Sequence, residues 1–294
     1  MAKKGCIILN TFSRPVNSVR QAERLCSEFK LRGVETEIIS GVPLRAGVEN
    51  GNPRSFVDCD FCVYLDKDKY FAEILEKLGV RLFNSAKSIE LCNDKAETYI
   101  KLSGEGLNIP KTVFSPLTYM QGDRFTDKET EALANYLSFP IVIKEVYGSM
   151  GLGVYMVNDV KELAVMREKL KLKPHLYQEY LPYKIGTDVR IILVGGKVVT
   201  AMERVNENDF RSNVAQGGVG RKINLPEEFK ITAEKCAEIL GLDYCGVDLL
   251  YGENGEPFVC EVNSNAFFDG IEKVTGVNIA ESYVNHVIKE LEKQ

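Results

Sequence analysis

The sequence of 294 residues has no apolar run that approaches the roughly eighteen residues needed to span a bilayer. Its longest apolar runs, such as Cys6–Leu9 and Ile191–Val194, have the length of buried strands. The first of them is too short for a signal peptide, because a polar segment begins at Asn10. We therefore expect a cytoplasmic protein with no membrane partner, in which the eight cysteines remain reduced.

An excess of basic residues is also missing, since 37 lysines and arginines face 42 acidic residues and the net charge is −5. This balance disfavours proteins that bind nucleic acids through a basic surface, so we expect no nucleic-acid partner. Histidine is scarce as well, and His175 and His286 are too isolated to support a catalytic dyad. No GxGxxG follows the first apolar run, which disfavours an ordinary dinucleotide site.

Cys59 and Cys62 form a CxxC pair, a spacing that is found in zinc and redox sites. The pair lies within Val57–Leu65, which has the pattern of a strand, and its odd offset would direct the two side chains to opposite faces. A zinc site needs four converging ligands, and no second CxxC follows. We therefore interpret both cysteines as structural residues.

Strand-like and helix-like segments alternate along the first ninety residues, a pattern that is typical of an open parallel α/β sheet. The expected elements are strands over Lys4–Leu9, Val34–Ile39, Asp60–Leu65 and Val80–Phe83, and helices over Pro15–Arg32 and Lys69–Leu78. Later helices are expected over Asn93–Gly106, Lys161–Leu172, Ile231–Leu240 and Asn278–Leu291.

The pattern changes twice further along the chain. Phe139–Lys144 and Val154–Val157 are apolar strands on either side of a glycine-rich segment, which predicts a covering hairpin rather than a Walker loop. From Gly186 onward we expect antiparallel strands, with Gly195 and Gly196 as a two-residue turn. The sequence therefore predicts an α/β (α+β) chain of three segments, 1–90, 91–185 and 186–294.

Three glycines lie within the six residues Gly148-Ser-Met-Gly-Leu-Gly153. Without Cβ atoms they let backbone amides approach phosphate oxygens, although a lone match of this kind is also typical of a flexible hairpin tip. Lys144, at a strand end four residues before the loop, favours the phosphate interpretation because a lysine there reaches phosphate as a point charge. Taken alone, Lys144 would equally suit a solvated strand end.

Two acidic residues and an asparagine lie on neighbouring strand-like segments. Asp248 lies in an apolar strand, and Glu261 and Asn263 are two residues apart in the next one, so they share a face that Asp248 can approach. This oxygen-rich set suits Mg²⁺ that holds nucleotide phosphates, and it does not suit zinc. An ordinary cross-strand arrangement would pair the carboxylates with Lys or Arg, and neither strand contains one. We therefore predict a metal site.

A third group of residues can bind the rest of a nucleotide. The stretch Asp209–Asn213 places an arginine beside Ser and Asn, where it can grip transferring phosphoryl oxygens. Arg190 and Arg204, on adjacent strands, would add to the positive charge there, although an arginine of this kind, taken alone, is more commonly a surface or ion-pair residue. Gln178–Leu181, at a strand end, offers backbone groups to an adenine edge, and Asp188 offers acceptors to ribose hydroxyls.

In their order and spacing these motifs resemble those of the ATP-grasp superfamily, and most closely its RimK-like branch. That branch contains ATP-dependent carboxylate–amine ligases of the ribosomal-protein glutamate ligase type, which add amino acids such as glutamate to protein or small-molecule acceptors. The resemblance covers roughly residues 90–290 and includes Lys144, the glycine loop, Gln178–Leu181, Asp188, Asp209–Asn213, Gly246–Asp248, Glu261–Asn263 and Gly270–Lys273. It implies an ATP-grasp fold with a pre-ATP-grasp domain at 1–90, a small lobe at 91–185 and a large lobe at 186–294.

The resemblance also implies roles for the matching residues. Lys95 and Lys144 would hold ATP phosphates under the glycine loop, Glu179–Asp188 would line adenine and ribose, and the expected catalytic residues are Arg211 and Arg190. The full set expected to bind ATP is Lys95, Lys144, Gly148, Ser149, Met150, Gly151, Gln178, Glu179, Tyr180, Leu181, Asp188, Arg211, Ser212 and Asn213. The set expected to bind two Mg²⁺ or Mn²⁺ ions is Asp248, Glu261 and Asn263.

One segment departs from the branch, which commonly has a Ser-Pro-Gly turn after Glu-Val-Asn, whereas this chain has Ser264–Gly270. In the family that segment borders the acceptor region, so the identity of the acceptor, protein or small molecule, stays open. Relatives often form dimers or tetramers, and we expect a homo-oligomer here.

The implied reaction has two steps: a carboxylate attacks the γ-phosphoryl group of ATP, and an amine then displaces phosphate to form an amide. Other ATP-grasp ligases, of the D-alanine–D-alanine or biotin carboxylase type, are alternatives that the stretch Asp209–Asn213 disfavours. A non-catalytic nucleotide sensor is a further alternative, and the intact acidic set argues against it. A structural protein would require three ligand-like clusters to be coincidental.

Overall fold

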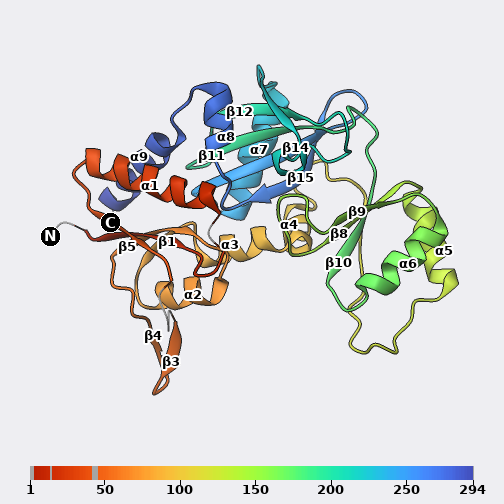
Figure 1. Ribbon diagram of the computed structural model, residues 1–294, viewed down its shortest axis with the longest axis horizontal. Coiled ribbons are helices and arrows are strands. Elements are labelled where there is room, and N and C mark those ends of the chain that lie inside the picture. The colour runs from red at the N-terminus through yellow and green to blue at the C-terminus, as the bar shows by residue number, and fades with distance from the viewer. Residues whose placement is uncertain (1–2, 14, 42–45, 294) are drawn as a thin grey trace.

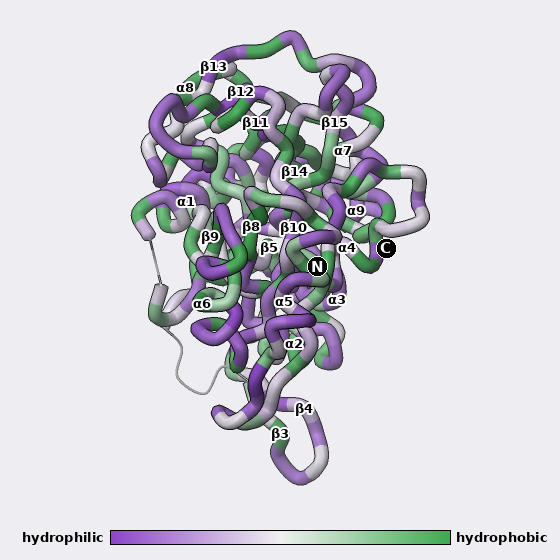
Figure 2. Tube along the Cα trace, turned by 90° about the vertical axis from the view of Figure 1, so that its right-hand side faces the viewer, coloured by the Kyte–Doolittle hydropathy of each residue, from purple (hydrophilic) through white to green (hydrophobic). Residues whose placement is uncertain are grey.

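Three β-sheets form the framework of the computed structural model, which describes residues 3–13, 15–41 and 46–293. A separate hairpin, β3 (Gly47–Glu49) and β4 (Asn52–Arg54), projects away from the rest of the molecule (Figures 1 and 2). Over the described ranges we find no helix that combines the length and the apolar character needed to cross a membrane.

The N-terminal sheet is parallel and has the strand order β2-β1-β5-β6. Its elements are β1 (Gly5–Leu9), α1 (Val16–Leu31), β2 (Thr36–Ile39), β5 (Phe61–Leu65), α2 (Lys69–Lys77), β6 (Arg81–Phe83) and α3 (Ala86–Asn93). The central strands β1 and β5 are buried at every residue, as expected for a parallel sheet that is covered on both faces. The predicted parallel α/β sheet is therefore confirmed.

The middle sheet is antiparallel, with the order β7-β10-β8-β9. Its elements are α4 (Lys95–Leu102), β7 (Thr112–Phe114), α5 (Asp127–Leu137), β8 (Ile141–Glu145), β9 (Val154–Val157), α6 (Val160–Leu170) and β10 (His175–Glu179). Strands β8 and β9 form the predicted hairpin around the glycine-rich segment. Helix α5 was not predicted, although Thr126 and Glu129 form a capping box at its start that is visible in the sequence.

The large sheet is also antiparallel, with the order β13-β12-β11-β14-β15. Its elements are β11 (Thr187–Val194), β12 (Lys197–Val205), β13 (Val219–Lys222), α7 (Glu227–Leu240), β14 (Tyr244–Tyr251), β15 (Pro257–Asn263), α8 (Asp269–Thr275) and α9 (Ile279–Glu292), with a short 3-10 helix at Val214–Gln216. Strands β11 and β12 meet at the predicted glycine turn. Helix α7 packs on one face of the sheet, because alternate residues of β11 and β14 enter its apolar cluster.

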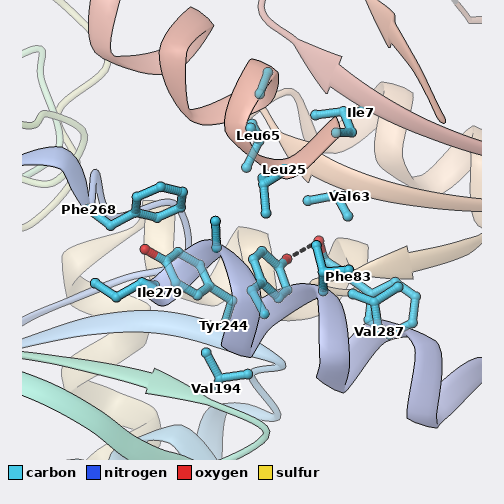
Figure 3. Packing of buried hydrophobic residues seen from close by; sticks show 14 of the residues in the cluster. Ile7, Leu25, Val63, Leu65, Phe83, Val194, Tyr244, Phe268, Ile279 and Val287 are labelled. Atoms are coloured by element: carbon cyan, nitrogen blue, oxygen red, sulfur yellow. Dashed lines mark hydrogen bonds between the residues drawn. The ribbon is translucent and has the colours of Figure 1, made fainter. Parts of the chain in front are cut away.

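The opposite face of the large sheet shares a core with the N-terminal sheet (Figure 3). This cluster joins residues of β1, α1 and β5 to residues of α8 and α9, and Figure 1 shows α1 beside α9. Within it the Tyr283 hydroxyl donates to the carbonyl of Phe83 at 2.9 Å. The predicted boundaries near 90 and 185 stay predictions. Segment 1–90 has an apolar cluster of its own, which includes Phe71 and Leu75 of α2. Its other apolar cluster is shared with the large sheet and is partly buried by the last helix.

Asn84 connects the two sheets at a second point. Its Nδ2 donates to the carbonyls of Tyr244 (2.7 Å) and Ser264 (2.9 Å), and its Oδ1 accepts from the backbone of Asp243 (2.7 Å) and Tyr244 (3.0 Å). The amide is buried and fully hydrogen-bonded, so it fixes the register between the end of β6 and the start of β14.

The prediction that Cys59 and Cys62 point to opposite faces is wrong. Strand β5 begins only at Phe61, so Cys59 precedes it and is not bound by strand alternation. The thiols of Cys59 and Cys62 both interact with the buried thiol of Cys6. In the described part of the chain we find no group of three or more His, Cys, Asp and Glu side chains that could hold a metal, and the cysteines there form no disulfide bond.

Candidate active site

A cavity lies between the middle sheet and the large sheet, and residues from both line it. From the middle sheet and its loops come Val142, Lys144, Ser149, Gly151, Leu152, Val154, Gln178, Glu179, Tyr180 and Leu181. From the large sheet and its loops come Asp188, Arg204, Phe210, Arg211, Ser212, Asn213, Asp248, Leu250, Cys260 and Glu261, with Lys95 from α4. Further residues are Tyr183, Lys184, Ile185 and Gly186 from the connecting segment and Thr187 at the start of β11.

Strand alternation explains which side chains face the cavity. On β8, Val142 and Lys144 point into it while Ile141 and Ile143 pack under α5 and α6. On β15 the alternation is broken by a register shift opposite Asp248, so the consecutive residues Cys260 and Glu261 both line the cavity. The bulge therefore brings an additional side chain to the site. It also shifts the alternation, so that Val259 before it and Val262 after it both face the apolar cluster under α7.

The glycine-rich loop lies against the large lobe. Its carbonyls accept hydrogen bonds at three points: Gly148 from Lys95 (2.9 Å), Met150 from Gln216 (3.2 Å) and Gly151 from Arg211 (3.1 Å). A Cβ at Gly151 would approach the side-chain oxygen of Asn213 to 3.0 Å, and φ there is +76°. Glycine is therefore required where the loop meets the opposite lobe.

Asp248 is the acidic centre of a buried charge network. Arg190 donates to both of its oxygens, at 2.7 and 2.6 Å, and Arg204 lies 3.0 Å from Oδ2. Arg204 also donates to both oxygens of Asp188. Burial opposes the charged form of Asp248, but the two guanidinium groups outweigh it and hold the pKa of its carboxyl below the ordinary value. The expectation that these carboxylates lack cationic partners is wrong, because Arg190 and Arg204 reach Asp248 from β11 and β12.

Glu261 and Asn263 lie on β15 in register with β14, Glu261 opposite Asp248 and Asn263 opposite Gly246. Lys95 is 3.3 Å from the Glu261 carboxylate, and the buried Nδ2 of Asn263 has no hydrogen-bond partner among the described residues. Two carboxylates and an amide oxygen fit Mg²⁺, which often takes one or two carboxylates and completes its shell with water and phosphate. The donor set therefore suits the predicted metal.

The segment that was expected to bind adenine forms the end of β10. Gln178 donates to Thr112 at 2.9 Å, and a Glu179 oxygen accepts from the backbone of Lys111 at 2.6 Å. Among the described residues, the backbone groups of Tyr180 and Leu181 make no hydrogen bond and remain free for a ligand. Val142, Val154 and Leu250 supply apolar walls nearby.

Most of the predicted site residues meet in this cavity. Those that line it are Lys95, Lys144, Ser149, Gly151, Gln178, Glu179, Tyr180, Leu181, Asp188, Arg211, Ser212, Asn213, Asp248 and Glu261. Gly148, Met150, Arg190 and Asn263 are not among the residues that line it. The apolar walls and Cys260 were missed; strand alternation next to Lys144 and Asp248 is the signal that identifies Val142 and Leu250, whereas the bulge leaves no clear mark in the sequence.

A family model described as the RimK-like ATP-grasp domain matches residues 92–287, more than half of the chain. A probable alpha-L-glutamate ligase from Marinomonas sp. (strain MWYL1) is 36% identical over 217 residues, which cover 73% of this chain and 69% of that protein. Beta-citrylglutamate synthase B from Homo sapiens is 36% identical over 220 residues, which cover 74% of this chain and only 55% of that protein.

Among solved structures, D-alanine–D-alanine ligase from Bacillus anthracis complexed with ATP superposes with a TM-score of 0.74. The match covers 99% of this chain and 98% of that one at 19% identity, and it shows the fold alone. The predicted ATP-grasp fold and the predicted class, a RimK-like ATP-grasp ligase, are confirmed. The chain belongs to the RimK-like ATP-grasp family.

Proposed function

We propose that this chain is an ATP-dependent carboxylate–amine ligase that adds glutamate, or a similar amino acid, to an acceptor carboxylate. The main support for this proposal is that one cavity contains both groups that suit adenine and groups that suit metal-bound phosphates. Apolar side chains and free backbone groups at one end suit adenine, and Lys95, Lys144, Asp248 and Glu261 suit metal-bound phosphates.

In the proposed reaction an acceptor carboxylate oxygen attacks the γ-phosphorus of ATP. The bond from that phosphorus to its bridging oxygen breaks, ADP leaves, and an acyl phosphate remains. The amine of the amino acid then attacks the acyl carbon, inorganic phosphate leaves, and the nitrogen loses a proton to solvent. This chemistry needs alignment and charge rather than a protein nucleophile. Lys95, Lys144 and Arg211 would supply that charge.

Asp248, Glu261 and Asn263 would hold Mg²⁺ or Mn²⁺, and we propose two ions. Bound ions would neutralise phosphate charge. Before they bind, Glu261 is balanced by Lys95 and Asp248 by Arg190 and Arg204. We therefore propose that these ion pairs rearrange when the metal–nucleotide complex binds. The carboxylates of Asp248 and Glu261 would then bind the metal, and the cations that had paired with them would bind phosphate.

The names of the two relatives support the choice of substrates. Both contain glutamate, which favours glutamate as the amine, and one contains citrate, which favours an acceptor with several carboxylates. Citrate and peptides that end in glutamate are the first acceptors to test. We further propose a cytoplasmic location, a dimer or tetramer, and domain boundaries near residues 90 and 185.

The test is ADP release by the purified chain with Mg²⁺ and ATP over a matrix of amino acids and acids, with mass detection of the conjugate. We expect ADP and conjugate in equal amounts, and only when acid and amine are both present. The folded variant Asp248→Asn should form neither ADP nor conjugate. The control is Glu253→Gln, at an exposed acid in the turn between β14 and β15, and it should form both. Calorimetry in which the folded wild type fails to bind Mg²⁺–ATP would refute the proposal.

A further inference from the structure

Lys67 lies just beyond the carboxyl end of β5, in the turn that leads into α2. The carboxyl ends of parallel strands are where open α/β sheets bind ligands. All the site residues described so far come from α4 and the two later sheets, so the N-terminal sheet has contributed none of them. Lys67 is a cation that this sheet brings toward Glu261 of the proposed metal site.

The turn that carries Lys67 is held in place by polar contacts. Asp66 Oδ1 accepts from the side chain of Asn10 at 2.9 Å and from the backbone of Lys67 at 2.7 Å. Two residues later, the carbonyl of Asp68 accepts from the Tyr64 hydroxyl at 2.6 Å, and the Asp68 side chain caps α2. The backbone of Lys67 is therefore positioned by its neighbours on both sides.

The same turn faces the strand that carries the predicted metal ligands. Asn265, two residues beyond the end of β15, donates to the carbonyl of Leu65 at 2.8 Å, so the ends of β5 and β15 lie side by side. Lys67 is close enough to Glu261 and Lys95 to interact with both electrostatically. It approaches them from the N-terminal sheet, whereas the glycine loop lies on the side of the middle sheet.

Lys67 is half-buried, and its ammonium group has no hydrogen bond or ion pair with any residue in the described ranges. Other lysines near the site differ: Lys95 contacts Gly148 and Glu261, and Lys69 pairs with Glu90. Burial lowers the pKa of Lys67, and the charge of Glu261 opposes that effect. A cation that is removed from water without a partner is costly unless an anion completes it.

We propose that the ammonium group of Lys67 binds the acceptor carboxylate and the acyl phosphate made from it. This inference rests on the proposed ligase function and names the residue that selects an anionic acceptor. In the proposed function Lys95 and Lys144 hold the ATP phosphates, so the anion that Lys67 would meet from the opposite side is the second substrate. The carboxylate would thus be held between Lys67 and the metal site, in line with the γ-phosphoryl group.

The test compares Lys67→Met and Lys67→Arg with Lys69→Met, a control at the first residue of α2 whose side chain is exposed and paired with Glu90. Loss of a charged hydrogen bond should raise KM for citrate, or for the best acid of the panel, by about tenfold or more in Lys67→Met, with KM for ATP unchanged. Lys67→Arg should restore most of the loss, and Lys69→Met should match the wild type. An unchanged KM for the acid, or an equal rise for ATP, overturns the proposal.

The two proposals fail in different ways. Calorimetry of citrate binding in the presence of Mg²⁺ and a non-hydrolysable ATP analogue measures the acceptor site without turnover. A wild type that binds citrate but forms no product contradicts the ligase function, and loss of that binding in Lys67→Met still supports Lys67. Equal citrate binding by the wild type and Lys67→Met, or citrate binding by neither, overturns the role of Lys67, whether or not ADP is released.

Discussion

Arg190 and Asp248 face each other in register on β11 and β14, and the guanidinium group donates to both carboxylate oxygens. One of the two predicted catalytic arginines and one of the three predicted metal ligands are therefore one unit in this structure. The effects of substituting Arg190 and Asp248 on the free energy of unfolding should not be additive, because residues in contact share their interaction energy.

Arg190→Met should lower the free energy of unfolding by roughly 3 kcal/mol, because it leaves a buried carboxylate with one cation fewer. Arg221→Met is the control, since Arg221 is exposed and only loosely paired with Glu207, at 3.8 Å. Urea unfolding checks both. A loss in Arg190→Met no larger than in Arg221→Met would show that the pair adds little stability.

Stability should also depend on pH through Asp248. The pKa of its carboxyl is lowered in the folded chain, so its contribution is complete above the unfolded value near 3.9 and is lost as pH falls through the folded value. The difference in unfolding free energy between wild type and Asp248→Asn should be level above about pH 5 and shrink below about pH 4. A difference that stays constant down to pH 3 would contradict this linkage.

Glu261→Gln should lower the rate of ADP release by about two decades or more, because it removes a charge that is proposed to hold metal. Circular dichroism should show an unchanged fold, since Glu261 is only partly buried. Glu253→Gln provides the matched control. A folded Glu261→Gln enzyme with a normal rate would remove Glu261 from the metal site.

Gly151→Ala should raise KM for ATP by roughly tenfold, since alanine at φ +76° costs about 1–2 kcal/mol and its Cβ meets Asn213. Gly122→Ala is the control, because a Cβ there meets nothing within 4 Å. Steady-state kinetics with ATP varied distinguishes the two. Equal KM values would mean that the loop moves freely around position 151.

Asn84→Ala should cost about 3 kcal/mol or more of unfolding free energy, because it removes four hydrogen bonds and leaves buried backbone groups unpaired. Asn254→Ala, in an exposed turn, should cost less than about 0.5 kcal/mol. Thermal or urea unfolding compares them. A small loss in Asn84→Ala would show that the two sheets are joined mainly by apolar contacts.

The sequence predicted the fold best in segments where the spacing of apolar residues indicates one kind of element. Buried β1 and β5, the glycine hairpin β8–β9 and the turn at Gly195 and Gly196 follow directly from apolar runs and turn residues. Helices α5 and α8 were missed because their apolar residues are few and their boundaries depend on capping and packing.

The part of the candidate site that consists of local sequence motifs was predictable. Lys144, the glycine loop and Asp248 are found by their spacing, and they do meet in one cavity. Spacing gives no information about which cation lies opposite a carboxylate. The Arg190–Asp248 pair and the approach of Lys67 to Glu261 depend on which strands are neighbours, and only the folded topology determines that.

The contact of α1 with α9 has a consequence for how this protein is made. The first sheet leaves the ribosome early, yet residues 279–292, which cover part of its apolar surface, are synthesised much later. Until then that surface stays exposed, at the concentration and temperature of the cell. The nascent chain should therefore remain vulnerable to aggregation and to chaperone capture until α9 has been synthesised.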